Sequence, residues 1–211
     1  MINVRGVSKA NLVDLCFKFG AVTTLSYFAY DAIREWLKNP SRITLLLIVL
    51  SACISVTVSL ASSRPTTRNL SPFAIFLTLA ATYYYPALVL TPGVHVIPEF
   101  AGAAIQVIGI GWEIYSKLSL GRSFGMLPAH RSVVIRGAYR FVRHPIYLGY
   151  FMHYVGFLLA NFGWQNFFIY TGLFVILIFR IFMEENVLKQ EDRSYQLYCD
   201  RVRFRVVPLV F

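Results

Sequence analysis

Apolar residues dominate the chain in long stretches, and charged residues fall mainly between these stretches. Six stretches are candidate transmembrane helices, near residues 12–30, 43–61, 71–91, 98–118, 145–161 and 164–183. A helix needs roughly 20 mainly apolar residues to cross the hydrocarbon core of a bilayer. The last two stretches are short, and the segment NFGWQN that joins them predicts a tight helical hairpin. The pattern therefore predicts an all-α integral membrane protein with five to six transmembrane helices.

The composition supports this fold class. The chain has 211 residues, of which 57% are hydrophobic and 14% charged, whereas a soluble domain averages roughly 25% charged residues. This length suits one compact domain. Cys16, Cys53 and Cys199 are too few and too scattered for a disulfide framework or a zinc site, so we expect no metal. No small-residue cleavage site follows the first apolar stretch, so we expect a retained helix there rather than a signal peptide.

The charge distribution predicts an orientation in the membrane. A net charge of +10 could indicate a nucleic acid partner, but Lys and Arg cluster beside the apolar stretches. The positive-inside rule explains such flanks, so we expect a lipid bilayer as partner and no nucleic acid. Residues 91–100 contain no Lys or Arg and residues 117–143 contain six, which predicts that 117–143 and both termini face the cytoplasm. The loop with Arg34, Lys38 and Arg42 conflicts with this orientation, so either the first helix differs or the larger inside charge outweighs it.

A polar segment, RHPIYLGY at residues 143–150, opens the fifth apolar stretch. Pro145 is typical of the first position of a helix, where its missing N–H costs nothing. The free N–H groups of that first turn form a ready anion site, and His144 and Tyr147 are placed to face it. The basic loop before it suits an anionic ligand, although attraction to lipid headgroups explains the same charges. A His or Tyr at the interface is also commonly an aromatic-belt anchor, so both interpretations stay open.

A second polar segment, RIFMEE at residues 180–185, ends the sixth apolar stretch. Arg180 and Glu184 are four residues apart and share a helix face, whereas Glu185 points about 100° away, toward another partner or solvent. Ionisable residues at membrane depth cost about 2.5–3.5 kcal/mol each and are therefore functional candidates, with an intrahelical salt bridge as the alternative. Because the last two stretches form a hairpin, both polar segments should lie on the same side of the membrane. We therefore expect a pocket that faces the cytoplasm.

Two pairs of glycines predict close helix packing. Gly102 and Gly109 lie seven residues apart, as do Gly149 and Gly156, so each pair lines one face of a helix. Small residues on a shared face let membrane helices approach closely. Pro86 lies inside the third stretch and is interpreted as a kink that the helix tolerates.

Three segments together resemble a known family: GAYRFVRHPIYLGY, RIFMEENVL and YQLYCDRVRFRVVP. They are similar to the isoprenylcysteine carboxyl methyltransferases, which belong to a wider group of membrane methyltransferases that includes phospholipid N-methyltransferases. The resemblance covers roughly residues 115–211, so we expect N-terminal transmembrane helices over 1–114 and a methyltransferase-like core over 115–211. It implies transfer of a methyl group from S-adenosylmethionine to a lipid-borne acceptor.

The resemblance also implies residue roles. Glu184 and Arg180 become the catalytic pair, with Arg180 facing the substrate. Arg131 stands where the family commonly has His, and the glycine of the family's FGxxYxxY tail is missing here, although the Tyr195 and Tyr198 spacing remains. The cofactor's carboxylate suits Arg143 beside a helix N-terminus, and its ammonium and sulfonium suit a carboxylate and aromatic faces. The predicted cofactor site consists of Arg131, Ser132, Val133, Val134, Tyr139, Arg143, His144, Pro145, Ile146, Tyr147, Glu184 and Glu185.

Several functions remain open at the level of sequence. We expect a lipid carboxylate, as in isoprenylcysteine, as the acceptor, since it is already ionised at pH 7 and Arg180 could hold it by paired hydrogen bonds. A phospholipid or other lipid amine would need a general base, for which His130 and His153 are the candidates. Some membrane sterol reductases share a similar core but hold a nicotinamide cofactor, and they tend to carry Asp-Glu where this chain has Glu184-Glu185. A membrane scaffold without activity is the last alternative.

Overall fold

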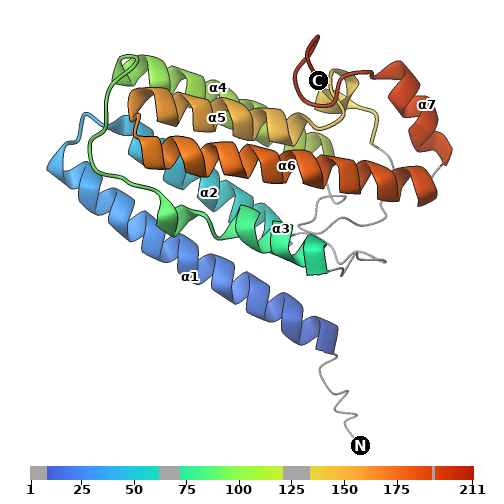
Figure 1. Ribbon diagram of the computed structural model, residues 1–211, viewed down its shortest axis with the longest axis horizontal. Coiled ribbons are helices and arrows are strands. Elements are labelled where there is room, and N and C mark those ends of the chain that lie inside the picture. The colour runs from blue at the N-terminus through green and yellow to red at the C-terminus, as the bar shows by residue number, and fades with distance from the viewer. Residues whose placement is uncertain (1–8, 62–71, 121–133, 192) are drawn as a thin grey trace, which may run out of the picture.

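The computed structural model describes residues 9–61, 72–120, 134–191 and 193–211, and these fold as helices (Figure 1). Within the described ranges, extended structure is limited to one isolated bridge between Val94 and Phe162. The prediction of an all-α fold is therefore confirmed. The helices are α1 (Lys9–Lys38), α2 (Ile43–Ala61), α3 (Pro72–Thr82), η1 (Tyr85–Ala87), α4 (Glu99–Leu120), η3 (Gly137–Arg140), α5 (Pro145–Ala160), α6 (Trp164–Glu191) and α7 (Arg193–Arg201).

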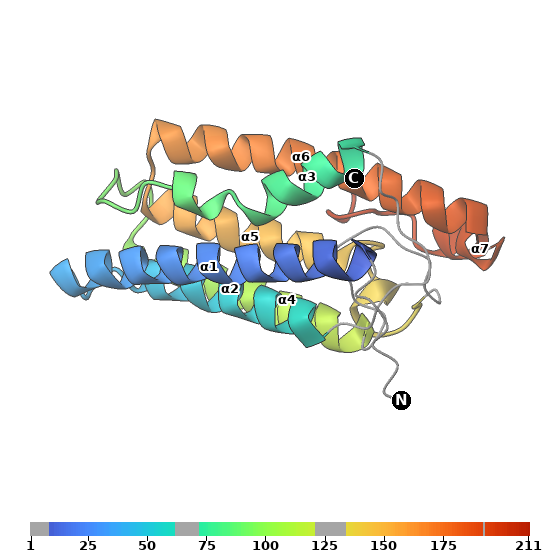
Figure 2. The same ribbon diagram turned by 90° about the horizontal axis from the view of Figure 1, so that it is seen from below.

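The long helices lie side by side, and successive helices run in opposite directions (Figures 1 and 2). The turns after α1, before α4 and between α5 and α6 therefore lie together at one end of the bundle, which we call the hairpin end. The segment before α5, the short helix α7 and the C-terminus lie at the other end, which we call the α7 end. The predicted hairpin is thus formed by α5 and α6, so the start of α5 and the last turns of α6 share the α7 end.

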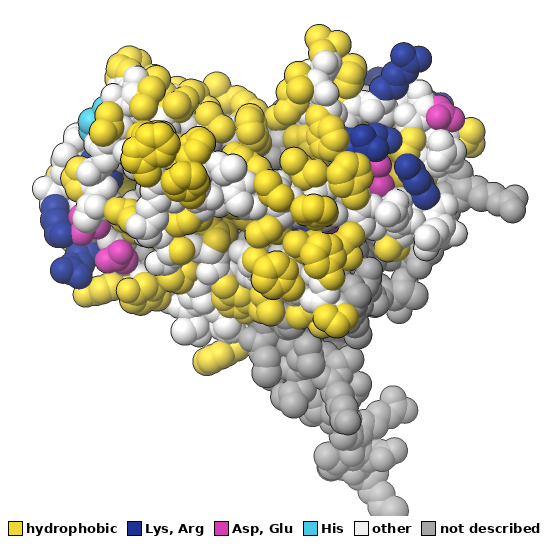
Figure 3. All heavy atoms as spheres, in the orientation of Figure 1, with side chains coloured by type: hydrophobic (Ala, Val, Ile, Leu, Met, Phe, Trp, Pro, Cys, Tyr) yellow, Lys and Arg dark blue, Asp and Glu magenta, His cyan; other side chains and the backbone are white. Residues whose placement is uncertain are grey.

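The outer surface has the pattern of a membrane protein. Hydrophobic side chains cover the middle of the face in Figure 3, and charged side chains gather toward its two ends. Large apolar side chains such as Phe100 on α4 and Phe168 on α6 are exposed. In the described part of the chain, one helix, α6, is long and apolar enough to cross a membrane by itself. The number of spans stays a prediction.

Close contact between α4 and α5 confirms the predicted role of the glycines. A Cβ built on Gly102 would lie 2.7 Å from the Gly156 carbonyl oxygen, and one built on Gly109 would lie 2.9 Å from the Gly149 oxygen. The reverse distances, from Gly156 and Gly149 to the oxygens across the interface, are also 2.7 and 2.9 Å. No side chain fits at these four positions unless the helices move apart.

The third predicted helix, over residues 71–91, is wrong in length. α3 ends at Thr82, and the chain then turns through Tyr84 into η1, where Pro86 stands near the start. A proline ring clashes with the carbonyl of the residue four positions earlier, and that residue here is Thr82. Pro86 therefore ends the helix rather than kinking it, and Tyr84 is buried in the core.

The first predicted helix, over residues 12–30, is too short, and this changes the meaning of the basic loop. α1 continues to Lys38, so Arg34 and Lys38 belong to a helix. Arg42 is only 2% exposed and donates to the Asn161 side chain at 2.7 Å and to the Leu90 carbonyl at 2.8 Å. Arg42 thus holds the turns of the hairpin end together and adds little charge to the surface.

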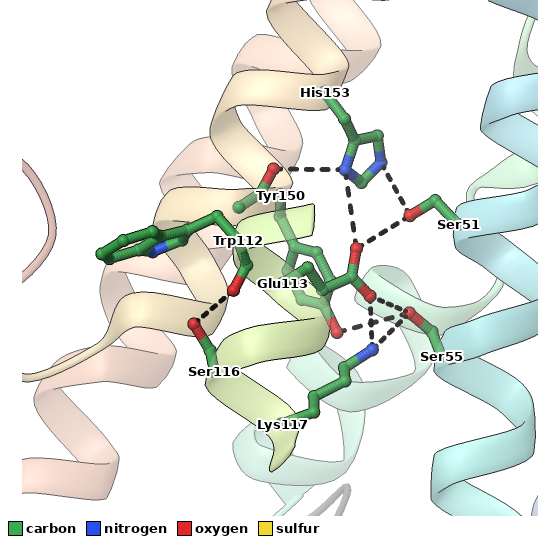
Figure 4. Close-up of polar contacts among 9 residues, drawn as sticks. Ser51, Ser55, Trp112, Glu113, Ser116, Lys117, Tyr150 and His153 are labelled. Carbon is green, nitrogen blue, oxygen red and sulfur yellow. Dashed lines mark hydrogen bonds and ion pairs between the residues drawn. The ribbon is translucent and has the colours of Figure 1, made fainter. Parts of the chain in front are cut away.

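A buried polar cluster joins α2, α4 and α5 (Figure 4). Glu113 of α4 forms an ion pair with Lys117 one turn later and accepts hydrogen bonds from Ser51 and Ser55 of α2, each at 3.0 Å. His153 of α5 lies 3.8 Å from the same carboxylate. Charged groups inside a bundle need such partners because isolated charges are costly to bury.

Candidate cofactor and substrate site

The N-terminus of α5 begins as the sequence predicts. Pro145 is the first helical residue, and His144 is the N-cap. The backbone N–H of His144 donates to the carbonyl of Arg205 at 2.7 Å, and that of Arg143 donates to the carbonyl of Phe204 at 3.0 Å. The C-terminal segment therefore holds the chain in place where it enters α5.

α6 continues beyond the apolar stretch, so the second polar segment lies in the same helix. Arg180 Nη2 lies 3.5 Å from Glu184 Oε1, which confirms that the two residues share a face. The hydroxyl of Tyr147 on α5 donates to the same oxygen at 2.7 Å. The two polar segments therefore meet, as the hairpin argument predicts.

His144 connects the two adjacent glutamates. Its Nδ1 lies 3.8 Å from Glu184 Oε2, and its Nε2 lies 3.3 Å from Glu185 Oε1. The imidazole also stacks on the Tyr147 ring, with centroids 5.8 Å apart. We call His144, Tyr147, Arg180 and Glu184 the candidate site.

The two glutamates have different surroundings. The side chain of Glu184 is 23% exposed, whereas that of Glu185 is 2% exposed. Both oxygens of Glu185 face cations: Arg143 Nε lies 3.2 Å from Oε1, and Arg205 Nε donates to Oε2 at 3.2 Å. The Arg143 contact is an ion pair without the alignment of a hydrogen bond. Glu185 thus faces buried protein partners rather than solvent.

Tyr139 in η3 lies beside the candidate site and is held by α7. The hydroxyl of Tyr198 donates to the Tyr139 carbonyl at 2.8 Å, and both residues pack in a small cluster with Tyr195. Burial, and after it the charge of Glu184, raises the pKa of the Tyr139 phenol above its usual value. The phenol therefore stays protonated at neutral pH and can donate a hydrogen bond.

The other predicted cofactor residues are less informative. Arg131, Ser132 and Val133 lie outside the described residues. Val134 and Ile146 are partly buried, and Pro145 is buried in its role as first residue of α5. These positions stay predictions.

Two structural features were not predicted from the sequence. Arg205 lies in an irregular segment, where no periodicity assigns it a face or a partner. The pair Glu113 and Lys117 had a usable signal, since opposite charges four residues apart in an apolar helix point to a buried ion pair. His153, a candidate base, belongs to that buried cluster and not to the candidate site.

Chemically, the candidate site combines an accessible carboxylate with aromatic rings and cations. Glu184 can hold a cationic group, and the faces of Tyr147 and His144 lie beside it. Arg180 can bind an anion or stay paired with Glu184. These features suit a ligand with charges of both signs.

Part of the chain is similar to a known protein family. Residues 98–191 match the phospholipid methyltransferase family. The match covers α4, η3, α5 and α6 and amounts to just under half of the chain. The region is therefore similar to a family of the wider group of membrane methyltransferases, whereas the closer resemblance to isoprenylcysteine enzymes stays a prediction. A search of curated proteins found no match.

Proposed function

We propose that the protein is an integral membrane methyltransferase that uses S-adenosylmethionine and acts on a lipid-borne acceptor. The observation that carries this proposal is the convergence of His144, Tyr147 and Glu184 inside the matched region. The match favours a methyltransferase over a nicotinamide-dependent reductase or an inactive scaffold. The apolar surface favours an acceptor that reaches the site from the membrane.

The residues present fit this cofactor. S-adenosylmethionine supplies an electrophilic methyl group on a sulfonium, and its amino acid portion carries an ammonium and a carboxylate. Glu184 is the partly exposed carboxylate of the site and would hold a positive group. The stacked rings of His144 and Tyr147 would lie against a cation, as aromatic faces attract positive charge. Arg143 would lie toward the carboxylate, whereas the N–H groups of Tyr147 and Leu148 in the first turn of α5 already donate to the His144 carbonyl.

The residues of the site then have different roles in the reaction. Tyr147 and Arg180 hold the Glu184 carboxylate through the same oxygen, Oε1. Tyr139 offers a protonated phenol whose pKa is raised by burial and by the charge of that carboxylate. Methyl transfer requires an in-line approach of the nucleophile, so positioning by these side chains would supply much of the rate.

A phospholipid amine is the first candidate for the acceptor. The matched family supports it. Arg180 is already ion-paired with Glu184, so its charge is less available to bind a carboxylate acceptor. An ammonium must lose a proton before it can attack the methyl group. His144 reaches both glutamates and is the described group best placed to receive that proton.

A lipid carboxylate of the isoprenylcysteine type is the second candidate. Arg180 favours it, because a guanidinium can bind a carboxylate with two parallel hydrogen bonds. Arg180→Lys would then lower turnover and leave cofactor affinity nearly unchanged, since lysine keeps the charge but loses the planar fork. If Arg180→Lys abolishes cofactor binding instead, Arg180 belongs to the cofactor side and the carboxylate loses its main support.

The test has two stages. Calorimetry on the purified protein in detergent should show binding of S-adenosylmethionine and of its demethylated product, and no binding at millimolar ligand would overturn the assignment. The second stage supplies cofactor with a labelled methyl group to lipid nanodiscs that contain phosphatidylethanolamine, or to a farnesylated cysteine. Label on an amine survives alkali, whereas label in a methyl ester is released by it, so the product identifies the acceptor.

A further inference from the structure

The chain after α7 lies against the candidate site and is bonded to both of its helices. We call residues 202–211 the C-terminal strap. Its carbonyls at Phe204 and Arg205 accept the N–H groups of Arg143 and His144 at 3.0 and 2.7 Å. The strap therefore fixes the backbone of the two residues that precede α5.

Arg205 extends this contact to α6. Its Nε donates to Glu185 Oε2 at 3.2 Å, and its guanidinium carbon lies 5.2 Å from the ring centroids of both Phe182 and Phe211. Phe182 belongs to α6 and Phe211 to the strap. A planar guanidinium suits this place, since it can lie over aromatic faces while its edge donates to a carboxylate.

The two carboxylate oxygens of Glu185 have different partners. Oε2 accepts from Arg205, while Oε1 faces His144 Nε2 at 3.3 Å. With both oxygens engaged, the carboxylate has little freedom to rotate. Because Nε2 of His144 is held in this way, its Nδ1 is directed to the Glu184 side, at 3.8 Å from Oε2.

We propose that Arg205 is a positioning residue for the candidate site: it orients Glu185, and Glu185 orients the His144 ring against Tyr147 and Glu184. The Arg205 side chain acts through Glu185, whereas its backbone carbonyl accepts the His144 N–H, a bond that a side-chain substitution leaves in place. The effect on cofactor affinity rests on the proposed function, whereas the effect on His144 does not. A strap that only stabilised the fold would leave the His144 ring environment unchanged.

The experiment compares Arg205→Gln with Arg205→Lys and with a matched control, Arg203→Gln. Arg203 lies in the same segment and is exposed, so its replacement makes the same charge change at the surface. The chain has four histidines, so ¹⁵N-histidine labelling gives few ring signals, and His144→Gln identifies the one that belongs to His144. The ring signals are recorded on ligand-free protein in detergent, and affinity for S-adenosylmethionine is measured by calorimetry.

Arg205→Gln should shift the His144 ring signals and weaken cofactor affinity by about tenfold, the usual scale for a lost charge-assisted contact. Arg205→Lys should cause a smaller change of the same kind, and Arg203→Gln should cause none. The proposal is overturned if the His144 signals of Arg205→Gln match the wild type, or if Arg203→Gln has the same effect. If wild-type protein binds no cofactor, the proposed function fails, and the His144 signals still decide the role of Arg205.

Discussion

At the scale of single residues, the adjacent acids Glu184 and Glu185 separate into two roles. Glu184 is partly exposed and meets a tyrosine hydroxyl and one arginine, whereas Glu185 is buried among Arg143, His144 and Arg205. Helical periodicity alone puts them about 100° apart. The structure shows that the two carboxylates have different partners. The same substitution is therefore expected to have different effects at the two positions.

Glu184→Gln should weaken binding of S-adenosylmethionine more than Glu185→Gln. Losing one hydrogen-bonded charge in a partly dry site costs about 1.5–3 kcal/mol. Glu185→Gln should lower stability, because it leaves Arg143 and Arg205 without their buried counter-charge. Its effect on affinity should be indirect, through His144, and no larger than the loss of about tenfold expected for Arg205→Gln. Calorimetry and thermal unfolding in detergent measure the two effects. Equal losses of affinity, or a larger one for Glu185→Gln, would show that Glu184 is not the carboxylate that faces the cofactor.

The sequence was sufficient for some residues of the site and not for others. Pro145 and the pair Arg180 and Glu184 follow from local rules about helix starts and helical spacing, and the structure confirms both placements. Arg205 could not be found in this way, because it lies in an irregular segment 20 residues from Glu185. A contact between residues this far apart depends on the path of the C-terminal segment, which local sequence patterns do not give.

At the scale of elements, packing between α4 and α5 positions the start of α5, and four glycines make that packing possible. A seven-residue spacing within each helix predicts a shared face. Pro86 shows the limit of such patterns: hydropathy continues to residue 91, but the helix ends where the proline ring would meet a carbonyl. Apolar composition therefore located the segment without giving its helical length.

Gly109→Ala should destabilise the protein, and Gly111→Ala should not. A Cβ on Gly109 would lie 2.7 Å from the backbone nitrogen of His153, whereas one on Gly111 meets nothing within 4 Å. Overpacking of this kind costs about 1–3 kcal/mol, while alanine in an open helical position is neutral or gains up to about 1 kcal/mol. Thermal unfolding in detergent tests the contrast. Similar stability of the two variants would mean that α4 and α5 are less close than described.

The buried cluster of Figure 4 makes a second test of how α2, α4 and α5 are held together. Lys117→Met should cost about 3–5 kcal/mol, because it leaves the Glu113 carboxylate buried without its cation. The double variant Glu113→Met with Lys117→Met should be more stable than Lys117→Met alone, since an uncharged pair of similar volume avoids the cost of burying charge. Unfolding by detergent titration compares wild type, both single variants and the double variant. Strictly additive effects would exclude the ion pair.

At the scale of the whole molecule, the apolar middle and the two charged ends of Figure 3 set the position in a bilayer, and the balance of positive charge sets the direction. The structure weakens the earlier conflict at the hairpin end. Arg42 is buried, and Lys38 is paired with Glu35. The α7 end carries exposed arginines and lysines, namely Arg136, Arg140, Lys189, Arg201 and Arg203. From this difference in exposed positive charge we expect the candidate site to face the cytoplasm.

Single cysteines at the two ends test this orientation. Val94 at the hairpin end is 65% exposed and Leu209 at the α7 end is 87% exposed, so either position can take a cysteine at the surface. The background lacks Cys16, Cys53 and Cys199, and sealed right-side-out vesicles from the expression host are treated with a membrane-impermeant maleimide. Val94→Cys should react at once and Leu209→Cys only after the vesicles are opened, because the end with more exposed Lys and Arg stays in the cytoplasm. The reverse pattern would place the candidate site outside, where a cytoplasmic cofactor could not reach it. Reaction of both cysteines in sealed vesicles would show that the two ends do not lie on opposite sides of the membrane.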